Sequence, residues 1–230
     1  MIILAVDTSG PACGVALLNG DRVVYEGVAV NKHTHSVSLL PMIDEALSHS
    51  GLTVDDVELF AAVVGPGSFT GVRIGVSTVK GMAHAAGKPC AGVNALQALA
   101  AGISDTDALL CPIQDARAGQ VYGAAFGCGM PPKRVLGDMA AKLDVYLRAA
   151  LHCAKENQPL CFVGDGVQTY REAITEALKE RAVFPPAHLY YLRPSSAALL
   201  AQFETPVDYL TLLPLYLRAP QAERAHKGTV

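Results

Sequence analysis

The stretch from Gly65 to Gly75 reads Gly-Pro-Gly-Ser-Phe-Thr-Gly-Val-Arg-Ile-Gly, and it joins an apolar run at residues 59–64 to a helical run that ends near Ala86. Each glycine costs about 0.5–1 kcal/mol relative to alanine through lost backbone entropy, so this density of glycine indicates that the loop needs a bare backbone. We therefore expect a strand, a tight loop and a helix that begins at the loop.

The loop residues leave three interpretations open. The loop can be a cradle of backbone N–H groups for an anion, a surface that another polypeptide approaches closely, or a sharp turn without a ligand. It is not a Walker A loop, because Val72 and Arg73 follow Gly71 where that motif has Lys and then Ser or Thr. It is not a dinucleotide fingerprint, because the glycine spacing differs and residues 91–93 read Ala-Gly-Val where an acidic residue is needed.

Composition indicates a globular protein. The 230 residues are 51% hydrophobic and 17% charged, which is enough for a substantial core in one large domain or two small lobes. Without a basic leader segment or an apolar run of about 18 residues, we expect a cytoplasmic protein with no membrane contact. Six cysteines without a Cys-x-x-Cys pair indicate neither a zinc site nor a disulfide framework. The formal net charge of −3 argues against a nucleic-acid surface, so another subunit would hold any RNA.

The first half of the chain begins with an acidic turn between two strands. An apolar run at residues 2–6 leads to Asp7, Thr8 and Ser9, and the hairpin signal Asn19-Gly20 predicts a three-stranded antiparallel meander. An Asp with two hydroxyl side chains at the first turn is how the actin and sugar-kinase superfamily begins. The alternative is an Asx-type turn in which Asp7 and Thr8 bond their own backbone.

The second half repeats this plan. A strand at residues 108–113, a turn that contains Asp115 and Arg117, and a strand at residues 120–126 predict a second lobe. Residues 136–154 have a helical pattern. A duplicated unit of strand, acidic turn and strand is what a two-lobed actin-like fold requires.

The polar residues 102–107 are the best candidate for a lobe boundary. We expect an N-terminal lobe at residues 1–102 that carries the partner-binding helices, and a C-terminal lobe at residues 103–190. Residues 191–230 are expected to form a C-terminal helix and tail that return to the N-terminal lobe.

Taken together, these features resemble the TsaB (YeaZ-type) family. The resemblance covers nearly the whole chain, and the string from Gly65 to Gly75 is far more specific than a lone glycine pattern. The other matching residues are Val6 to Ser9, His35 and Ser36, Leu39 to Pro41, Asp115 to Arg117, Val121 and Tyr122, Gly164 to Gly166, and Pro214 to Arg218.

The resemblance implies an α/β structure with the actin-like ATPase fold (ASKHA, RNase H-like), built of two lobes that each contain a mixed sheet flanked by helices. It implies a role in forming N6-threonylcarbamoyladenosine at position 37 of tRNAs that read codons beginning with A. A TsaB-like protein there looks like a non-catalytic partner of the catalytic TsaD-like paralogue. A small TsaE-like ATPase joins them, and tRNA is contacted only through the complex. The label glycoprotein endopeptidase also accompanies such sequences, and we discount it.

Two departures from the catalytic branch predict that this chain lacks catalytic residues, a metal and a cofactor. That branch carries a His-x-x-x-His metal pair, whereas Leu39 stands four positions after His35, and His33 with His35 lacks a third ligand. After Asp115, the bulk of Arg117 occupies a turn where a phosphate would need glycine. The expected vestigial nucleotide cleft consists of Asp7, Thr8, Ser9, Asp115, Arg117, Gly164, Asp165 and Gly166.

The loop and the helix after it are expected to form the partner-binding surface. Phe69 would be a buried aromatic anchor, Arg73 a charged neighbour, and Gly71 with Gly75 would let a partner helix approach. The same surface would also allow a homodimer, and the alternative is that Phe69 and Arg73 only brace the lobe. The expected partner-binding residues are Pro66, Gly67, Ser68, Phe69, Thr70, Gly71, Val72, Arg73, Gly75, Val76 and Val79.

Two other functions compete with the subunit interpretation. An autonomous actin-like ATPase or small-molecule kinase would use Asp7 and Asp115 to position magnesium and a nucleophile. A metallopeptidase would need a ligand set that His33 and His35 do not complete with any obvious carboxylate.

Overall fold

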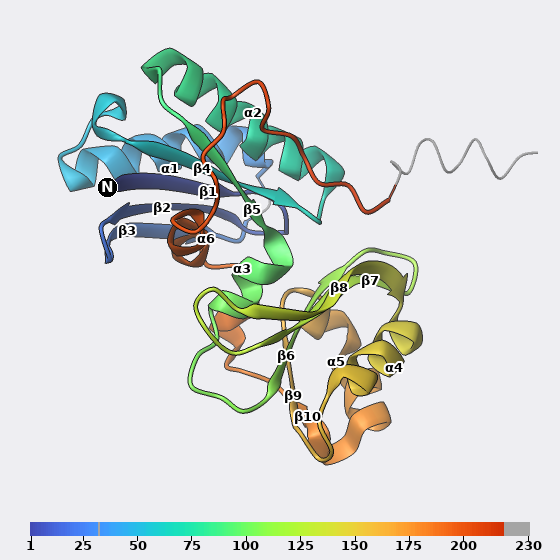
Figure 1. Cartoon of the computed structure of the whole chain (residues 1–230). Helices are drawn as coiled ribbons and strands as arrows, with labels where there is room; N and C mark the ends of the chain where they lie inside the picture. Colours follow the sequence, from blue (N-terminus) through green and yellow to red (C-terminus); the bar gives the residue numbers. More distant parts are fainter. Residues whose placement is uncertain (32, 219–230) are drawn as a thin grey trace, which may run out of the picture.

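The computed structural model describes residues 1–31 and 33–218, and it contains two five-stranded mixed sheets, one in each lobe (Figure 1). The first sheet has the order β3-β2-β1-β4-β5, in which β3, β2 and β1 are antiparallel neighbours and β1, β4 and β5 are parallel ones. Its strands are β1 (Ile2–Asp7), β2 (Cys13–Asn19), β3 (Arg22–Ala29), β4 (Leu59–Gly65) and β5 (Cys90–Asn94).

The second sheet repeats this plan in the order β10-β9-β6-β7-β8, with β6 in the place of β1. Strands β6, β7 and β8 are antiparallel neighbours, and β6, β9 and β10 are parallel ones. The duplication confirms the predicted two-lobed α/β fold. Its strands are β6 (Leu109–Asp115), β7 (Gln120–Gly127), β8 (Lys133–Lys142), β9 (Leu160–Val163) and β10 (Ala182–Val183).

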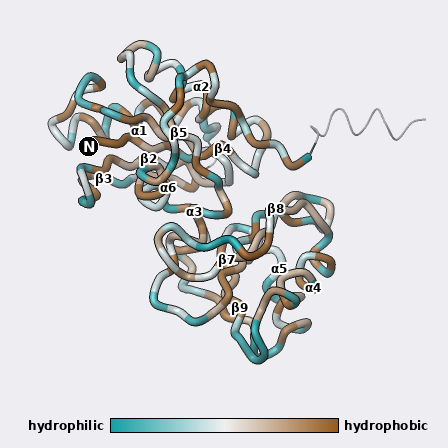
Figure 2. The backbone as a smooth tube through the Cα atoms, viewed as in Figure 1, coloured by the Kyte–Doolittle hydropathy of each residue, from teal (hydrophilic) through white to brown (hydrophobic). Residues whose placement is uncertain are grey.

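Helices cover both faces of each sheet. Since side chains alternate along a strand, Leu4 and Val6 of β1 face α1 and α2, whereas Ile3 and Ala5 face the opposite side, where α3 and α6 lie between the two sheets. Hydrophobic colours are concentrated on the strands of each lobe (Figure 2). The α-helices are α1 (His35–Ser50), α2 (Phe69–Ala86), α3 (Ala95–Ala101), α4 (Leu143–Cys153), α5 (Gly166–Leu178) and α6 (Pro194–Ala201), and three 3₁₀ turns are η1 (Val54–Asp56), η2 (Lys179–Arg181) and η3 (Ala187–Leu189).

The end of the described chain lies against the first lobe. Helix α6 packs on β1 and β2, and Val207 forms an antiparallel bridge with Cys90 at the edge of β5. The division of the chain at residues 102 and 190 stays a prediction, and residues 219–230 of the predicted third segment lie outside the described residues. None of the described helices combines the length and the apolar character that crossing a membrane requires.

One predicted element was wrong in detail. The helix expected at residues 136–154 is strand β8 up to Lys142 and helix α4 only from Leu143, because pairing with β7 overrides the helical preference of Leu, Met, Ala and Lys in β8. Helix α1 contains a proline, Pro41, well inside its length. Because proline has no N–H, the carbonyl of Val37 one turn earlier has no backbone donor. Val37 is 61% exposed, so water can reach this carbonyl.

Candidate functional site

The first acidic turn is almost fully buried. Asp7 Oδ1 accepts hydrogen bonds from the backbone N–H of Ser9 at 2.8 Å and from Ser9 Oγ at 2.7 Å, which is the Asx-type turn that the sequence left as an alternative. Burial raises the pKa of Asp7, and the hydrogen bonds from Ser9 and the charge of His35 lower it in part. Thr8 bonds to α2 rather than to its own turn, donating from Oγ1 to the carbonyl of Gly71 at 2.7 Å and accepting from the N–H of Gly75 at 3.1 Å.

The glycine loop packs directly on this turn. A Cβ atom on Gly71 would lie 2.0 Å from the carbonyl oxygen of Thr8, and one on Gly67 would lie 2.3 Å from the carbonyl oxygen of Ser9. The N–H of Ser68 donates to that same Ser9 oxygen at 2.7 Å, and Ser68 Oγ caps α2 by accepting from the N–H of Gly71. The bare backbone therefore makes room for another part of the same chain.

This packing corrects the expectation for part of the partner-binding set. The two glycines expected to admit a partner helix, Gly71 and Gly75, are buried against Thr8 instead. Phe69 is half-buried and lies beside Arg73, and its role as an aromatic anchor for a partner stays a prediction. The buried members of the set are Pro66, Gly71, Val72, Gly75, Val76 and Val79, Gly67 is half-buried, and the exposed ones are Ser68, Thr70 and Arg73.

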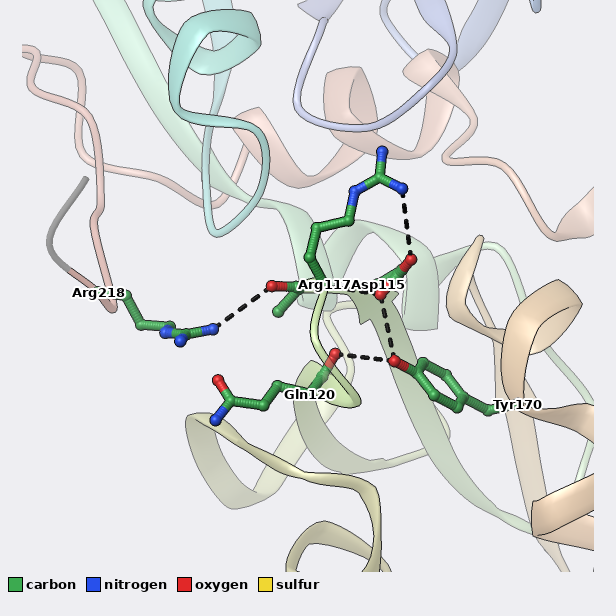
Figure 3. A network of polar contacts seen from close by, with 6 residues as sticks. Asp115, Arg117, Gln120, Tyr170 and Arg218 are labelled. Atoms are coloured by element: carbon green, nitrogen blue, oxygen red, sulfur yellow. Dashed lines mark hydrogen bonds and ion pairs between the residues drawn. The ribbon is translucent and has the colours of Figure 1, made fainter. Parts of the chain in front are cut away.

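The second acidic turn is occupied by its own neighbours (Figure 3). Asp115 Oδ1 accepts from the backbone N–H of Arg117 at 2.8 Å and from the hydroxyl of Tyr170 at 3.2 Å, and Oδ2 lies 3.8 Å from the Arg117 guanidinium. Arg117 has a φ of 65° and an 87% exposed side chain, so it crowds the turn less than expected but pairs with the carboxylate. Arg218 donates to the carbonyl of Ala116 at 3.4 Å and so ties the end of the described chain to this turn.

Asp165 is the third carboxyl group of the predicted cleft, and it lies between the two turns. Burial, together with the charges of Asp115 and Asp7, raises its pKa to about 6, although backbone hydrogen bonds lower it in part. Its neighbours Gly164 and Gly166 pack against the carbonyl of Ile113 on β6, where a Cβ on Gly164 would lie only 2.1 Å away. The structure thus brings Asp165 of the second lobe to the same cavity as Asp7 of the first.

Residues Tyr190, Tyr191 and Leu192 close the space between the two lobes at this point. They line, with Asp7 and Asp165, a cavity of about 10 Å³, which is about what a single water molecule needs. The hydroxyl of Tyr190 accepts from the Arg171 guanidinium at 2.7 Å, the hydroxyl of Tyr191 accepts from the Gln168 amide at 2.9 Å, and Leu192 belongs to the core between the sheets. A nucleotide does not fit into this arrangement.

His33 and His35, the two histidines considered as metal ligands, lie in different surroundings. His35 Nε2 lies 3.0 Å from the carbonyl of Gly10 and so supports the first acidic turn, whereas His33 is exposed. Across residues 1–31 and 33–218, no three His, Cys, Asp or Glu side chains are grouped so that they could hold a metal ion.

The outer surface of α1 and α2 carries exposed apolar and small residues. On α1, Val37 and Leu40 are 61% and 59% exposed. The exposed positions of α2 at intervals of three or four residues are Thr70, Arg73, Ser77, Gly81, His84 and Ala85. We call this outer surface the α1–α2 face. Its inner side packs on the first sheet, and two of its exposed residues contact the end of the described chain, His84 beside Tyr209 and Arg73 beside Tyr216.

Sequence reasoning missed two parts of this region. The closing residues Tyr190 to Leu192 lie far along the chain from both acidic turns, and no motif marks them. The pairing of Tyr216 with Phe69 and Arg73 was missed as well, although Tyr216 lies in a segment that matched the family. Both parts depend on tertiary contacts, so no hydrophobic periodicity in the sequence predicts them.

Comparisons with known proteins agree with this architecture. Residues 25–226 match the model of a family described as TsaD, tRNA N6-adenosine threonylcarbamoyltransferase. The chain is 34% identical to the tRNA threonylcarbamoyladenosine biosynthesis protein TsaB of Bacillus subtilis, over 97% of this chain and 96% of that relative. YeaZ from Pseudomonas aeruginosa is 27% identical with a TM-score of 0.77, covering 94% of this chain and 99% of that chain. Component A of (R)-2-hydroxyglutaryl-CoA dehydratase from Acidaminococcus fermentans shares only the fold, with a TM-score of 0.53 at 13% identity over 87% of this chain and 97% of that chain.

Proposed function

Because the chain belongs to the TsaB family, we propose that it is a non-catalytic subunit in the formation of N6-threonylcarbamoyladenosine at position 37 of tRNAs that read codons beginning with A. It acts by binding a TsaD-like catalytic paralogue together with a TsaE-like ATPase, and it meets tRNA only through that complex. The names of its relatives support a role in threonylcarbamoyladenosine biosynthesis, and the geometry of this chain supports a non-catalytic role within it.

The observation that carries the non-catalytic role is the closed space between the lobes. An actin-like enzyme needs room there for a nucleotide and a cation, whereas here Tyr190 and Leu192 fill it and Asp115 is paired with Arg117. Asp7 is engaged by Ser9 and is only 2% exposed. The carboxylates of the two acidic turns are thus both engaged by neighbouring residues of this chain.

The α1–α2 face is the surface we assign to the paralogue. Interfaces are dominated by a few apolar, aromatic and Arg side chains, and this face offers Val37, Leu40 and Arg73. Further along α2, the small exposed residues Ser77 and Gly81 allow the backbone of a partner helix to come close. The same face would also serve a homodimer of the free chain, which then competes with the heterodimer.

Replacing Leu40 with aspartate is expected to weaken binding to the purified TsaD-like paralogue by at least about tenfold, because it places a charge at an apolar contact. The matched control is Val145→Asp, since Val145 is also an exposed apolar residue on a helix but lies on α4 in the second lobe. Titration calorimetry of both variants against the paralogue gives the comparison. Equal affinities of Leu40→Asp and the unchanged chain would move the interface elsewhere.

The purified chain alone is expected to hydrolyse no ATP above a blank with buffer. This result separates the proposal from the alternative of an autonomous actin-like ATPase or kinase, which requires turnover that Asp7→Asn and Asp115→Asn abolish. A phosphate-release assay with magnesium measures it. Sustained hydrolysis that both substitutions remove would favour the alternative. A metallopeptidase lacks support, because the described residues supply no ligand cluster.

A further inference from the structure

The last described segment, residues 207–218, runs along α2 in the opposite direction, and we call it the C-terminal strap. The ring of Tyr209 lies 4.3 Å from that of His84 near the end of α2, and the ring of Tyr216 lies 4.8 Å from that of Phe69 at its start. Between these ends, Lys80 Nζ donates to the carbonyl of Leu212 at 3.1 Å. Helix α2 therefore lies between α1 on one side and the strap on the other.

The strap is fixed to the first lobe by backbone and core contacts. The N–H of Leu215 donates to the carbonyl of Val64 at 2.7 Å, and Leu212 is 3% exposed within the same core as α1 and α2. A Cβ atom on Gly65 would lie 2.6 Å from the carbonyl oxygen of Leu215, so the first glycine of the signature loop makes room for the strap. These contacts give Tyr216 a defined position beside α2.

Arg73 is held between two aromatic rings by this arrangement. Its guanidinium carbon lies 3.9 Å from the centre of the Phe69 ring and 5.7 Å from that of Tyr216, and its Nε donates to the Tyr216 hydroxyl at 2.7 Å. Within residues 1–31 and 33–218, neither terminal nitrogen of Arg73 has a hydrogen-bond partner, and the side chain is exposed. Stacking and one hydrogen bond thus orient a guanidinium whose outer edge is available.

We propose that Phe69, Arg73 and Tyr216 form one composite anchor of the docking surface, and that the terminal nitrogens of Arg73 bind a carboxylate of the TsaD-like partner. This inference rests on the proposed function, because it assigns chemistry to the same surface. The paired N–H groups of arginine match the two oxygens of a carboxylate, and a side chain that is already oriented loses less entropy on binding. The strap is then part of the interface and not only a support for α2.

The surroundings favour a protein carboxylate over a nucleic-acid phosphate. Nucleic-acid surfaces carry clustered Lys and Arg, whereas the exposed neighbours of Arg73 on α2 are small or polar. The strap adds apolar surface, since Leu210 and Leu213 are 69% and 68% exposed. An oriented arginine beside exposed apolar side chains is typical of a protein interface.

The test measures affinity for the purified TsaD-like paralogue at two salt concentrations, using the full chain. We expect Arg73→Gln and Tyr216→Ala each to weaken binding by about tenfold or more, and Tyr216→Phe, which keeps the ring but loses the acceptor, by about threefold. Arg73→Lys should also weaken binding, because it keeps the charge but loses the paired geometry. The affinity of Arg73→Gln should fall less with added salt than that of the unchanged chain. Unfolding temperatures of the four variants identify any loss that comes from folding.

The possible failures are distinct. If the unchanged chain does not bind the paralogue, the proposed function fails. If it binds and Arg73→Gln and Tyr216→Ala bind equally well, the composite anchor is wrong while the proposed function stands. Arg73→Lys with unchanged affinity would overturn the paired contact with a carboxylate. Loss of binding to purified tRNA by the isolated Arg73→Gln chain, or of self-association alone, would overturn the choice of partner.

Discussion

Replacing Gly71 with alanine is expected to destabilise the protein by about 3 kcal/mol or more, and so to lower its unfolding temperature by roughly 6–12 °C. The added Cβ atom would lie 2.0 Å from the carbonyl oxygen of Thr8, and no flexible side chain can move aside because the obstacle is backbone. Either α2 must shift from β1, or the turn that holds Asp7 must open. Urea denaturation followed by circular dichroism measures the effect.

The matched control is Gly81→Ala in the same helix. Gly81 is exposed, and a Cβ atom built there has no neighbour within 4 Å, so this substitution should stabilise the protein by about 0.5–1 kcal/mol through helix propensity alone. The pair thus separates close packing from helix propensity, since both variants add one methyl group to α2. Equal effects of the two substitutions would contradict the packing of the loop on Thr8.

The duplicated strand plan was predictable because it depends on local signals. Apolar runs of strand length and acidic turns occur in both halves, the Asn19-Gly20 hairpin occurs in the first, and each signal depends only on residues close to it in the sequence. Strand β8 was missed because its Leu, Met, Ala and Lys residues favour a helix and only pairing with β7 makes it a strand. Long-range pairing is the part of the fold that periodicity does not encode.

The signature loop shows the same limit at the site. Its glycines correctly indicated that the backbone must be bare, but not what approaches it, since Thr8 stands 63 positions before Gly71. A ligand, a partner protein or another part of the same chain would each require a loop without side chains, so the glycines alone do not distinguish among them. The role of Tyr190 in closing the cavity depends on contacts from even more distant residues, so no pattern in the sequence marks it.

Thr8 links the first acidic turn to α2, which is part of the docking face that we propose. The turn that an actin-like enzyme uses for phosphate here bonds α2 through the Thr8 hydroxyl, which contacts both Gly71 and Gly75. A nucleotide at this turn would therefore compete with the contacts that position α2. Under the proposed function, the residues that an actin-like enzyme would use for phosphate instead fix the position of the helix that we assign to docking.

Replacing Asp165 with asparagine is expected to stabilise the protein at pH 8 and to change little at pH 4. Burial and the charges of Asp115 and Asp7 raise the pKa of Asp165 from 3.8 to about 6, so between these values the folded state binds more protons than the unfolded state. The contribution of Asp165 to the free energy of unfolding is therefore lost as the pH rises through about 6, and the complete loss is roughly 1–3 kcal/mol. Asparagine does not ionise, so a chain with asparagine at this position does not lose this stability at high pH.

The measurement is the free energy of unfolding in urea between pH 4 and pH 8, taken as the difference between Asp165→Asn and the unchanged chain. That difference should grow from near zero at pH 4 to its full value above pH 7. Asp144→Asn is the control, because Asp144 has a 62% exposed side chain paired with Arg148 and loses little solvation on folding. Since Asp7 also has a raised pKa, some decline of stability with pH should persist in Asp165→Asn. Parallel curves for the variant and the unchanged chain would mean that Asp165 is hydrated, and that the space between the lobes is open to water rather than closed by Tyr190 and Leu192.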